Sequence, residues 1–301
     1  SGVDYMHLVE IARNHIEKTG KRTIRDRMVR KLLAAVLPYP GRFRWALKAA
    51  PLGKPFAGTL KRIGMKPLAA MIEMALAFQK SGTKTFRLKL GTGIEADRRV
   101  IALAREALGA DARLRVDYNQ AYTADQAVRA IEAIAPFGID CAEQPVRADD
   151  WLGMARVQSR VAVPLMAHEG CFSLTDATAL IELGAIGVLG VNTERPGGIT
   201  QALRAIDFAS RRGLGTVLHN QPLGIASAAQ VQIGAARASV LGHAMELFGH
   251  VMLEDDLIVD PLDYSGGFVR VPEGAGLGVT LDVAALDRYA TAAPVVLERS
   301  R

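Results

Sequence analysis

The sequence predicts an α/β protein in which a parallel βα-barrel follows a helical segment. From residue 67 onward, helical patterns alternate with short apolar strands, and seven such units follow one another without a reversal. Strands that alternate with helices form a parallel sheet. Each strand also ends in a polar residue, and successive ones stand 23 to 28 residues apart, about one strand–helix–strand repeat. Because the chain has no glycine-rich phosphate loop, these observations favour a closed barrel over an open sheet.

A change in composition separates the helical segment from the barrel. Of the 301 residues, the first 66 include 15 Lys and Arg against 4 Asp and Glu, whereas the rest include 22 and 27. Apolar residues at three- and four-residue spacing predict helices in the first part. We therefore expect a basic helical segment over residues 1–66 and the barrel over residues 67–301. A solvated basic helical face explains this charge more simply than an acidic partner does.

The barrel elements are expected in a fixed order. Periodic apolar faces predict helices over residues 67–80, 94–108, 124–135, 151–160, 174–183, 198–212 and 226–236. Short apolar runs predict buried strands over residues 85–90, 114–119, 141–144, 164–169, 188–192, 216–220 and 243–248.

The residues at the strand ends are candidates for a functional site, because chemistry in a βα-barrel takes place at the carboxyl ends of its strands. Buried strands are otherwise apolar, so a polar residue at the same phase of each strand requires an explanation. The strand-end residues are Lys89, Asp117, Glu143, Glu169, Asn192, His219 and Glu246.

Three carboxylates on consecutive strands predict a metal site. Neighbouring strands lie about 4.8 Å apart, so Asp117, Glu143 and Glu169 can converge. Converging carboxylates repel one another unless a cation neutralises them, and oxygen ligands suit Mg²⁺. The alternative is that one of them is a surface acid; for Glu169, the adjacent His168 leaves the register of the strand open.

The remaining strand-end residues offer acid–base and substrate-binding groups. A cation next to Lys89 would favour its neutral amine, the form that acts as a general base. His219, on a distant strand, is a candidate for a second acid or base. Glu246 is a candidate hydrogen-bond donor to a substrate carboxylate, and Asn192 an orienting residue. We also expect three residues to bind substrate, namely Arg87, which can pair with a carboxylate, Asn119 and Asn220.

These segments resemble the enolase superfamily, in its mandelate racemase and muconate lactonizing enzyme branch, over roughly residues 67–293. The resemblance is carried by FRLKLG at 86–91, VDYNQ at 116–120, AEQP at 142–145, AHEG at 167–170, PGGIT at 196–200, HN at 219–220, ME at 245–246 and GAGLGV at 274–279. It implies an enolase-type barrel that holds Mg²⁺ through Asp117, Glu143 and Glu169. It also implies removal of the proton α to a carboxylate, which gives a metal-stabilised enolate.

Departures from the family pattern bear on the reaction. Many members have Lys where Arg87 stands, and Asn192 matches neither the Lys nor the Asp that members have at that strand end. His219 together with Glu246 resembles the racemase-like and acid-sugar dehydratase members. The first expectation is therefore dehydration of a hydroxy-carboxylate or acid sugar, with Lys89 as base and His219 assisting the leaving hydroxyl, or racemisation of such a substrate. A cycloisomerase or epimerase of the muconate lactonizing type is an alternative.

Residues 1–66 supply neither the capping domain nor the first barrel strand of the family. They resemble part of the glycolate oxidase iron–sulfur subunit, through SGVDY at 1–5 and LPYPGRFR at 37–44, but the cluster cysteines are absent. A truncated or fused barrel that binds metal without turnover is thus an alternative to a lyase or isomerase. An interaction protein that works through its basic helices is a weaker one, since no nucleic-acid-binding signature is present.

Cysteine content and hydropathy suggest the compartment and partners. Cys141 and Cys171 form no disulfide framework or metal-binding spacing, which is typical of a reducing cytoplasm. No uncharged run is long enough to span a membrane. We expect a small carboxylate as partner, neither nucleic acid nor membrane, and a homo-oligomer, because a barrel without its first strand exposes a strand edge.

Overall fold

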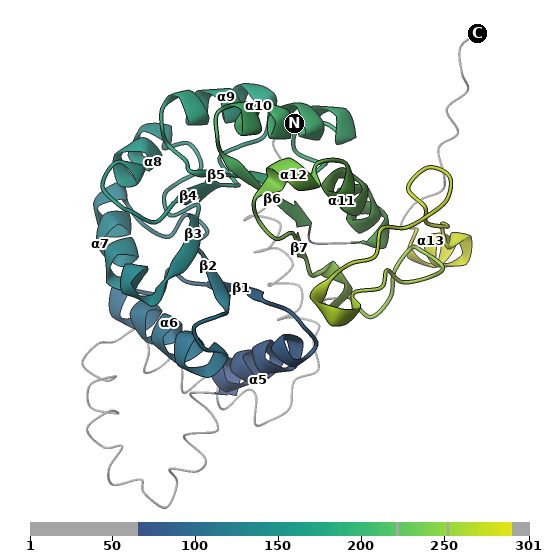
Figure 1. Ribbon diagram of the computed structural model, residues 1–301, viewed down its shortest axis with the longest axis horizontal. Helices are drawn as coiled ribbons and strands as arrows, with labels where there is room; N and C mark the ends of the chain where they lie inside the picture. Colours follow the sequence, from purple (N-terminus) through teal and green to yellow (C-terminus); the bar gives the residue numbers. More distant parts are fainter. Residues whose placement is uncertain (1–65, 221–222, 252, 291–301) are drawn as a thin grey trace, which may run out of the picture. The chain divides into compact units, whose positions relative to one another are not determined.

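Seven parallel strands form the sheet that the sequence predicts. The computed structural model describes residues 66–220, 223–251 and 253–290. The strands are hydrogen-bonded in chain order, and the sheet curls so that its first and last strands face each other (Figure 1). They are β1 (Thr85–Lys89), β2 (Arg113–Asp117), β3 (Ile139–Glu143), β4 (Leu165–Ala167), β5 (Val188–Val191), β6 (Gly215–Asn220) and β7 (Glu246–Leu247).

Helices precede, separate and follow the strands, and those between successive strands cover the convex side of the curl (Figure 1). They are α5 (Lys66–Lys80), α6 (Ile94–Leu108), α7 (Ala124–Ile134), α8 (Trp151–Gln158), α9 (Leu174–Glu182), α10 (Ile199–Arg211), α11 (Gly224–Ala236), α12 (Ala238–Leu241) and α13 (Val283–Tyr289). Single 3₁₀ turns are η2 (Ala135–Phe137), η3 (Gly249–Val251) and η4 (Ser265–Gly267). The alternation confirms the predicted fold class.

Local sequence signals set the ends of several helices. Helix α7 begins at a capping box, in which Thr123 is the N-cap and Gln126 reaches back to its backbone. At the start of α8, the Asp150 side chain accepts a hydrogen bond from the Gly153 amide at 2.8 Å. Such caps satisfy amides that have no partner within the helix. After η2, Gly138 has φ 70° and ψ 62°, a left-handed conformation that glycine adopts at low cost.

The core has two layers, one on each side of the sheet. The larger layer packs between the strands and the helices, and it includes Leu114, Leu165 and Leu189. The smaller layer fills the inside of the curl and consists of Cys141, Met166, Val188 and Val217. Residues of the two layers alternate along each strand because successive side chains point to opposite faces. The side chains inside the curl therefore have fixed positions relative to the strand ends.

The curled sheet has two edge strands, β1 and β7, which do not pair with each other within the described residues. Side chains bridge the two ends instead, because Arg115 on β2 donates to the Ala244 carbonyl at 2.9 Å and to Glu246 Oε1 at 3.2 Å. The guanidinium of Arg115 is completely buried, so this bridge passes through the interior of the curl.

The expectations for residues 1–65 lie outside the described part of the chain. These are the basic helical segment, its boundary with the barrel and the glycolate oxidase resemblance, which all stay predictions. None of the helices in the described part is long and apolar enough to cross a membrane.

Candidate active site

The two-residue alternation of a strand determines which strand-end side chains face the inside of the curl. Glu143 and His219 stand two residues after the inner-layer residues Cys141 and Val217, so they share their face. Glu169 stands three residues after Met166 and does not share this phase. On β1 and β2, Arg87 is paired in register with Arg115, and Lys89 with Asp117. Asp117 is in turn paired in register with Glu143 on β3. At the other end of the sheet, His219 on β6 is paired in register with Glu246 on β7. The structure thus brings acidic, basic and imidazole side chains together at the carboxyl ends of the strands.

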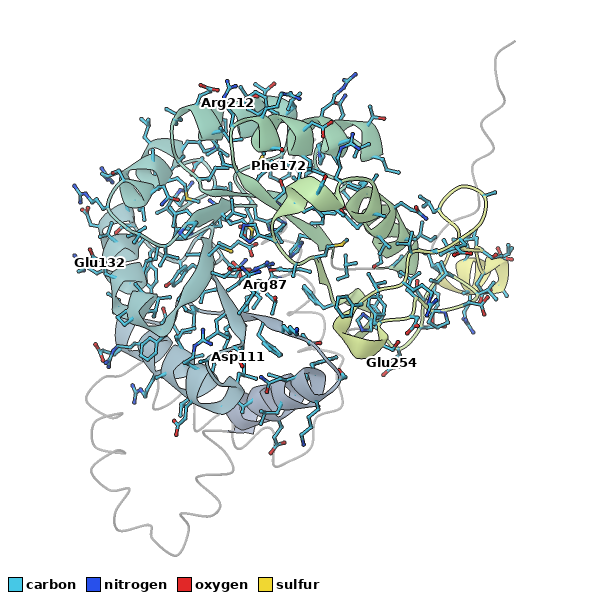
Figure 2. All side chains as sticks on the ribbon, in the orientation of Figure 1. Arg87, Asp111, Glu132, Phe172, Arg212 and Glu254 are labelled. Atoms are coloured by element: carbon cyan, nitrogen blue, oxygen red, sulfur yellow. The ribbon has the colours of Figure 1, made fainter. Side chains whose placement is uncertain are left out.

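Arg87 is the cation at the centre of this site (Figure 2). Its Nη1 lies 2.7 Å from Glu143 Oε2 and 3.3 Å from Asp117 Oδ2, and its Nε lies 3.1 Å from Glu246 Oε2. The side chain is 9% exposed, so these contacts form in a medium that screens charge weakly. Arg87 therefore neutralises carboxylates that would otherwise repel one another.

Lys89 lies at the solvent-exposed rim of the site. Its side chain is 54% exposed, and its ammonium donates to Asn119 Oδ1 at 2.7 Å and also contacts Asp117 Oδ2. The Asn119 amide in turn donates to Glu169 Oε1 at 2.7 Å. Lys89 is thus accessible to a small molecule and is oriented by two neighbouring side chains.

Glu143, His168 and His219 form a buried cluster below this rim. Each of the three side chains offers one possible ligand atom, and these three atoms all lie within 4.8 Å of one another. Among the described residues, no other group of three His, Cys, Asp or Glu side chains converges in this way. The two imidazole rings lie 4.3 Å apart between centroids. His168 Nδ1 lies 2.9 Å from Glu143 Oε1. This close contact does not have the geometry of a hydrogen bond, and Glu143 Oε1 has no hydrogen-bond partner among the described residues.

Burial and neighbouring charges determine the ionisation of the cluster. Burial opposes the charge of Glu143, but the contacts with His168 and Arg87 outweigh it and hold the pKa of Glu143 at about 2. Burial, with smaller effects of His168 and Arg87, lowers the pKa of His219 to about 2. The carboxylate is therefore charged and the imidazole of His219 neutral across the physiological pH range.

The two other carboxyls that face Arg87 are affected in the opposite direction. Burial, followed by the charge of Glu143, raises the pKa of Asp117. Burial is also the largest cause of the raised pKa of Glu246, and Arg87 and Arg115 act against it. Since the pKa of Glu143 is lowered, the shared arginine stabilises the charge of these carboxylates unequally.

Two side chains hold the backbone that carries His168. The Gln144 Oε1 atom accepts hydrogen bonds from the amides of His168 and Gly170 at 3.1 and 3.0 Å. Arg195 donates to the carbonyl of His168. Gln144 itself has φ 36°, an uncommon conformation for a residue with a side chain. Its position is therefore determined by the contacts that it makes.

The structure shows where each predicted site residue lies but does not test its role. Five of them lie close to Arg87 or to a residue that contacts Arg87, namely Lys89, Asp117, Glu143, His219 and Glu246. Glu169 contacts Asn119 and does not join the closest cluster. Asn192 Oδ1 accepts a hydrogen bond from the Arg195 amide at 3.1 Å. The side chain of Asn220 lies outside the described part.

Sequence reasoning missed His168 as a member of the site. The signal was present, because Met166 belongs to the inner layer and a side chain two residues further along a strand points to the same face. It also missed Gln144 and Arg195, whose contacts with His168 depend on loop conformation, for which no simple pattern exists.

The sequence over residues 70–285 matches the family described as Enolase C-terminal domain-like. The chain belongs to this family. Its relatives include the hydrophobic dipeptide epimerase of Enterococcus faecalis, which is 32% identical over 72% of this chain and 62% of that protein. Muconate cycloisomerase 1 of Pseudomonas putida is 32% identical over 69% of this chain and 56% of that protein. A crystal structure of muconate cycloisomerase from Pseudomonas fluorescens superposes with a TM-score of 0.71 at 29% identity, over 75% of this chain and 63% of that one.

These relatives confirm the resemblance to the mandelate racemase and muconate lactonizing enzyme branch. This chain spans between 56% and 63% of the length of each of these three relatives. Its matched part is the barrel, and the glycolate oxidase resemblance of residues 1–66 gains no support from the family match, which begins at residue 70.

The buried cluster fits a divalent cation. Glu143 Oε1, His168 Nε2 and His219 Nε2 are buried and have no hydrogen-bond partner among the described residues. Buried polar atoms without partners are costly, and a cation held by one atom of each of the three side chains would offset part of that cost. Carboxylate and neutral imidazole groups are common metal ligands.

Proposed function

We propose that this chain catalyses metal-assisted removal of the proton α to a carboxylate, the reaction type of the enolase superfamily. The observation that carries the proposal is the position of Lys89. Its ammonium lies at the exposed rim, held by Asn119, next to a buried cluster that fits a cation. A base at the rim can reach the α-carbon of a substrate whose carboxylate points toward the cluster.

The cation is the second part of the proposal. Mg²⁺ is the ion that the family resemblance implies, with Asp117, Glu143 and Glu169 as implied ligands, and Glu143 also belongs to the buried cluster. When bound, a divalent cation would stabilise the negative charge that develops on the substrate carboxylate. The chain itself would supply Lys89 as proton acceptor and Asn119 to orient it.

The choice among outcomes depends on how many groups can move a proton. Asn192 cannot titrate, and burial lowers the pKa of His219 to about 2, so this imidazole is a poor proton donor. Of the acid–base pair Lys89 and His219 that the sequence predicts, Lys89 is then the member able to move a proton. A single base favours cycloisomerisation, in line with the muconate cycloisomerase relative, over racemisation or His219-assisted dehydration, which need a second group.

The test is α-proton exchange in D₂O, followed by NMR. The full chain would be offered hydroxy acids, acid sugars, dipeptides and a muconate, each with metal and with a chelator. With substrates that carry an α-proton we expect metal-dependent deuterium incorporation with retention at the α-carbon. With a muconate we expect lactone formation, in which C–O bond formation gives the enolate and a solvent-derived deuteron is then delivered to the α-carbon. Inversion would support epimerisation, and a 2-keto product would support dehydration of a hydroxy acid or acid sugar. A folded, metal-loaded protein that exchanges nothing would favour the catalytically impaired alternative.

Assembly and location complete the proposal. We propose a homo-oligomer, because the edges of β1 and β7 offer unpaired backbone groups to another subunit. Light scattering that gives the mass of a single chain would contradict this. A reducing cytoplasmic location suits Cys141 and Cys171, which are both free and buried, and cell fractionation would test it.

A further inference from the structure

The buried cluster differs in ligand chemistry from a set of three carboxylates. It offers one carboxylate and two imidazoles from β3, the residue after β4, and β6. The intervening strand β5 has glycine, Gly190, at its inward position, so no side chain of β5 enters the space between the ligands. A Cβ added there would lie 2.8 Å from the Ala167 carbonyl oxygen and 3.5 Å from the Met166 side chain. Imidazole suits zinc, cobalt, nickel and copper, whereas Mg²⁺ prefers oxygen ligands.

The alternative carboxylates are already paired with other groups. Asp117 contacts both Lys89 and Arg87, and Glu169 accepts from Asn119. Arg87 lies against Asp117 and Glu143 Oε2, so a positive charge occupies the space between these two carboxylates and disfavours a second cation there. Glu143 Oε1, by contrast, lies 2.9 Å from His168 Nδ1.

We propose that Glu143, His168 and His219 bind a divalent transition-metal cation of the zinc and cobalt class in preference to Mg²⁺. Three protein ligands leave coordination positions open for a substrate carboxylate, as in catalytic rather than structural sites. The use of this ion in turnover rests on the proposed function, whereas the site itself rests on the geometry of the three side chains.

Neighbouring groups hold the ligands in place, as expected around a metal site. The backbone amide of His168 donates to Gln144, and its carbonyl accepts from Arg195. The carbonyl of His219 accepts from Gln230 Nε2 at 3.3 Å, and Phe248 packs edge-on to the His219 ring at 6.0 Å between centroids. The two imidazoles are thereby held where the ligand atoms converge.

The test is calorimetric titration of the metal-free full chain with Zn²⁺, Co²⁺ and Mg²⁺ in separate experiments. We expect one saturable site for Zn²⁺ and Co²⁺, with an affinity at least about 100-fold above that for Mg²⁺. His168→Ala and His219→Ala should each remove this site. His168→Asp should reduce the preference for Zn²⁺ over Mg²⁺, because it replaces nitrogen by oxygen. X-ray absorption of the Co²⁺-loaded protein should show scattering from two imidazoles.

Two variants control the titration. His250→Gln removes a histidine that stacks on Tyr264 and is not a member of the cluster, and should leave Zn²⁺ affinity unchanged. Glu169→Gln should also leave it unchanged, although the carboxylate set predicts a loss. Circular dichroism of each variant identifies one that fails to fold, and the Co²⁺ absorption spectrum of the wild type then tests the ligands without any substitution.

The inference is overturned if Glu169→Gln removes Zn²⁺ binding while His168→Ala retains it, or if Mg²⁺ binds as tightly as Zn²⁺. These outcomes are separate from the fate of the proposed function. Tight Zn²⁺ binding without α-proton exchange supports the site and contradicts the reaction. Exchange that Mg²⁺ supports in the His168→Ala variant supports the reaction and contradicts the site.

Discussion

At the scale of single residues, Arg87 pairs with three carboxylates inside the described barrel. One guanidinium contacts Asp117, Glu143 and Glu246, which come from three different strands. The sequence predicted Arg87 as a partner of a substrate carboxylate. In the structure it pairs with carboxylates of the protein, so its contribution to folding can be measured without a substrate.

Replacing Arg87 by Met should destabilise the fold. The substitution leaves three largely buried carboxylates without their shared cation, and removing one partner of a buried ion pair costs about 3–5 kcal/mol. Urea unfolding of the two proteins at neutral pH measures the difference. Arg113→Met is the matched control, because Arg113 is 52% exposed and forms one ion pair at 3.3 Å; we expect it to change the free energy of unfolding by less than about 1 kcal/mol. Equal losses in both variants would contradict the role of Arg87.

Replacing Lys89 by Met should remove α-proton exchange while the fold remains. Loss of a positioned general base typically reduces a rate by about 10²–10⁴-fold, and the Lys89 side chain is half-exposed, so stability should change little. Deuterium incorporation measured by NMR, on whichever carboxylate the wild type exchanges, gives the effect. Lys80→Met, at the exposed end of α5, is the control. Exchange at the wild-type rate in Lys89→Met would mean that another group takes the proton.

At the scale of elements, Gln144 links two loops. It follows β3 directly, and its side chain holds the backbone after β4 through the His168 and Gly170 amides. Its φ of 36° costs energy that surrounding contacts must offset.

Gln144→Ala should therefore destabilise the fold by about 1–3 kcal/mol, the usual effect of leaving buried amides without an acceptor. Gln144→Gly loses the same hydrogen bonds but tolerates the positive φ, so it should be more stable than the Ala variant by about 1 kcal/mol. Chemical denaturation of the three proteins gives this order. An Ala variant at least as stable as the Gly variant would show that the backbone of Gln144 is not strained.

The elements themselves could be predicted because each helix and strand has its own local pattern. The seven predicted strands and the helices between them are present in the predicted order. The main difference is β7, expected over residues 243–248 but limited to Glu246–Leu247. This strand pairs only with β6, through two residue pairs, and its other edge has no neighbour within the described residues. Regular strand structure depends on such pairing, which a local sequence pattern does not contain.

At the scale of the barrel, alternation along strands predicted which side chains face inward but not which of them pair. Lys89, Asp117, Glu143, His219 and Glu246 stand at the predicted strand ends. The contact of Arg115 with Glu246 joins residues 131 positions apart, and the curvature of the sheet decides it. The cluster of His168 with Glu143 and His219 depends on that curvature and on the loop that Gln144 holds.

The open side of the curl makes the ionic bridge between its ends important for the whole fold. Arg115 connects Glu246 on β7 with Asp140 on β3, whose Oδ2 accepts its Nε–H at 3.1 Å. His243, which precedes β7, lies 3.5 Å from the same oxygen. Asp140 thus pairs with the guanidinium of Arg115 and faces the imidazole of His243 near the joint between the sheet ends.

The last prediction concerns acid stability. The contact with His243, opposed by burial and reinforced by Arg115, lowers the pKa of Asp140 to about 2, against about 3.9 in an unfolded chain. Because the folded state binds the proton less readily, the contribution of Asp140 is fully present above about pH 4 and is lost as the pH falls toward about 2. It amounts to about 1–2 kcal/mol, since each pKa unit corresponds to about 1.4 kcal/mol and the group is partly solvated.

Asp140→Asn isolates this contribution from those of other carboxyls. We expect the difference in the free energy of unfolding between wild type and variant to be largest near neutral pH and to shrink between about pH 4 and pH 2. Urea titrations at a series of pH values give that difference. If it stays constant over this range, Asp140 stabilises the fold through packing rather than through charge. The bridge across the open side of the barrel would then depend on the hydrogen bonds of Arg115 to Ala244 and Glu246 alone.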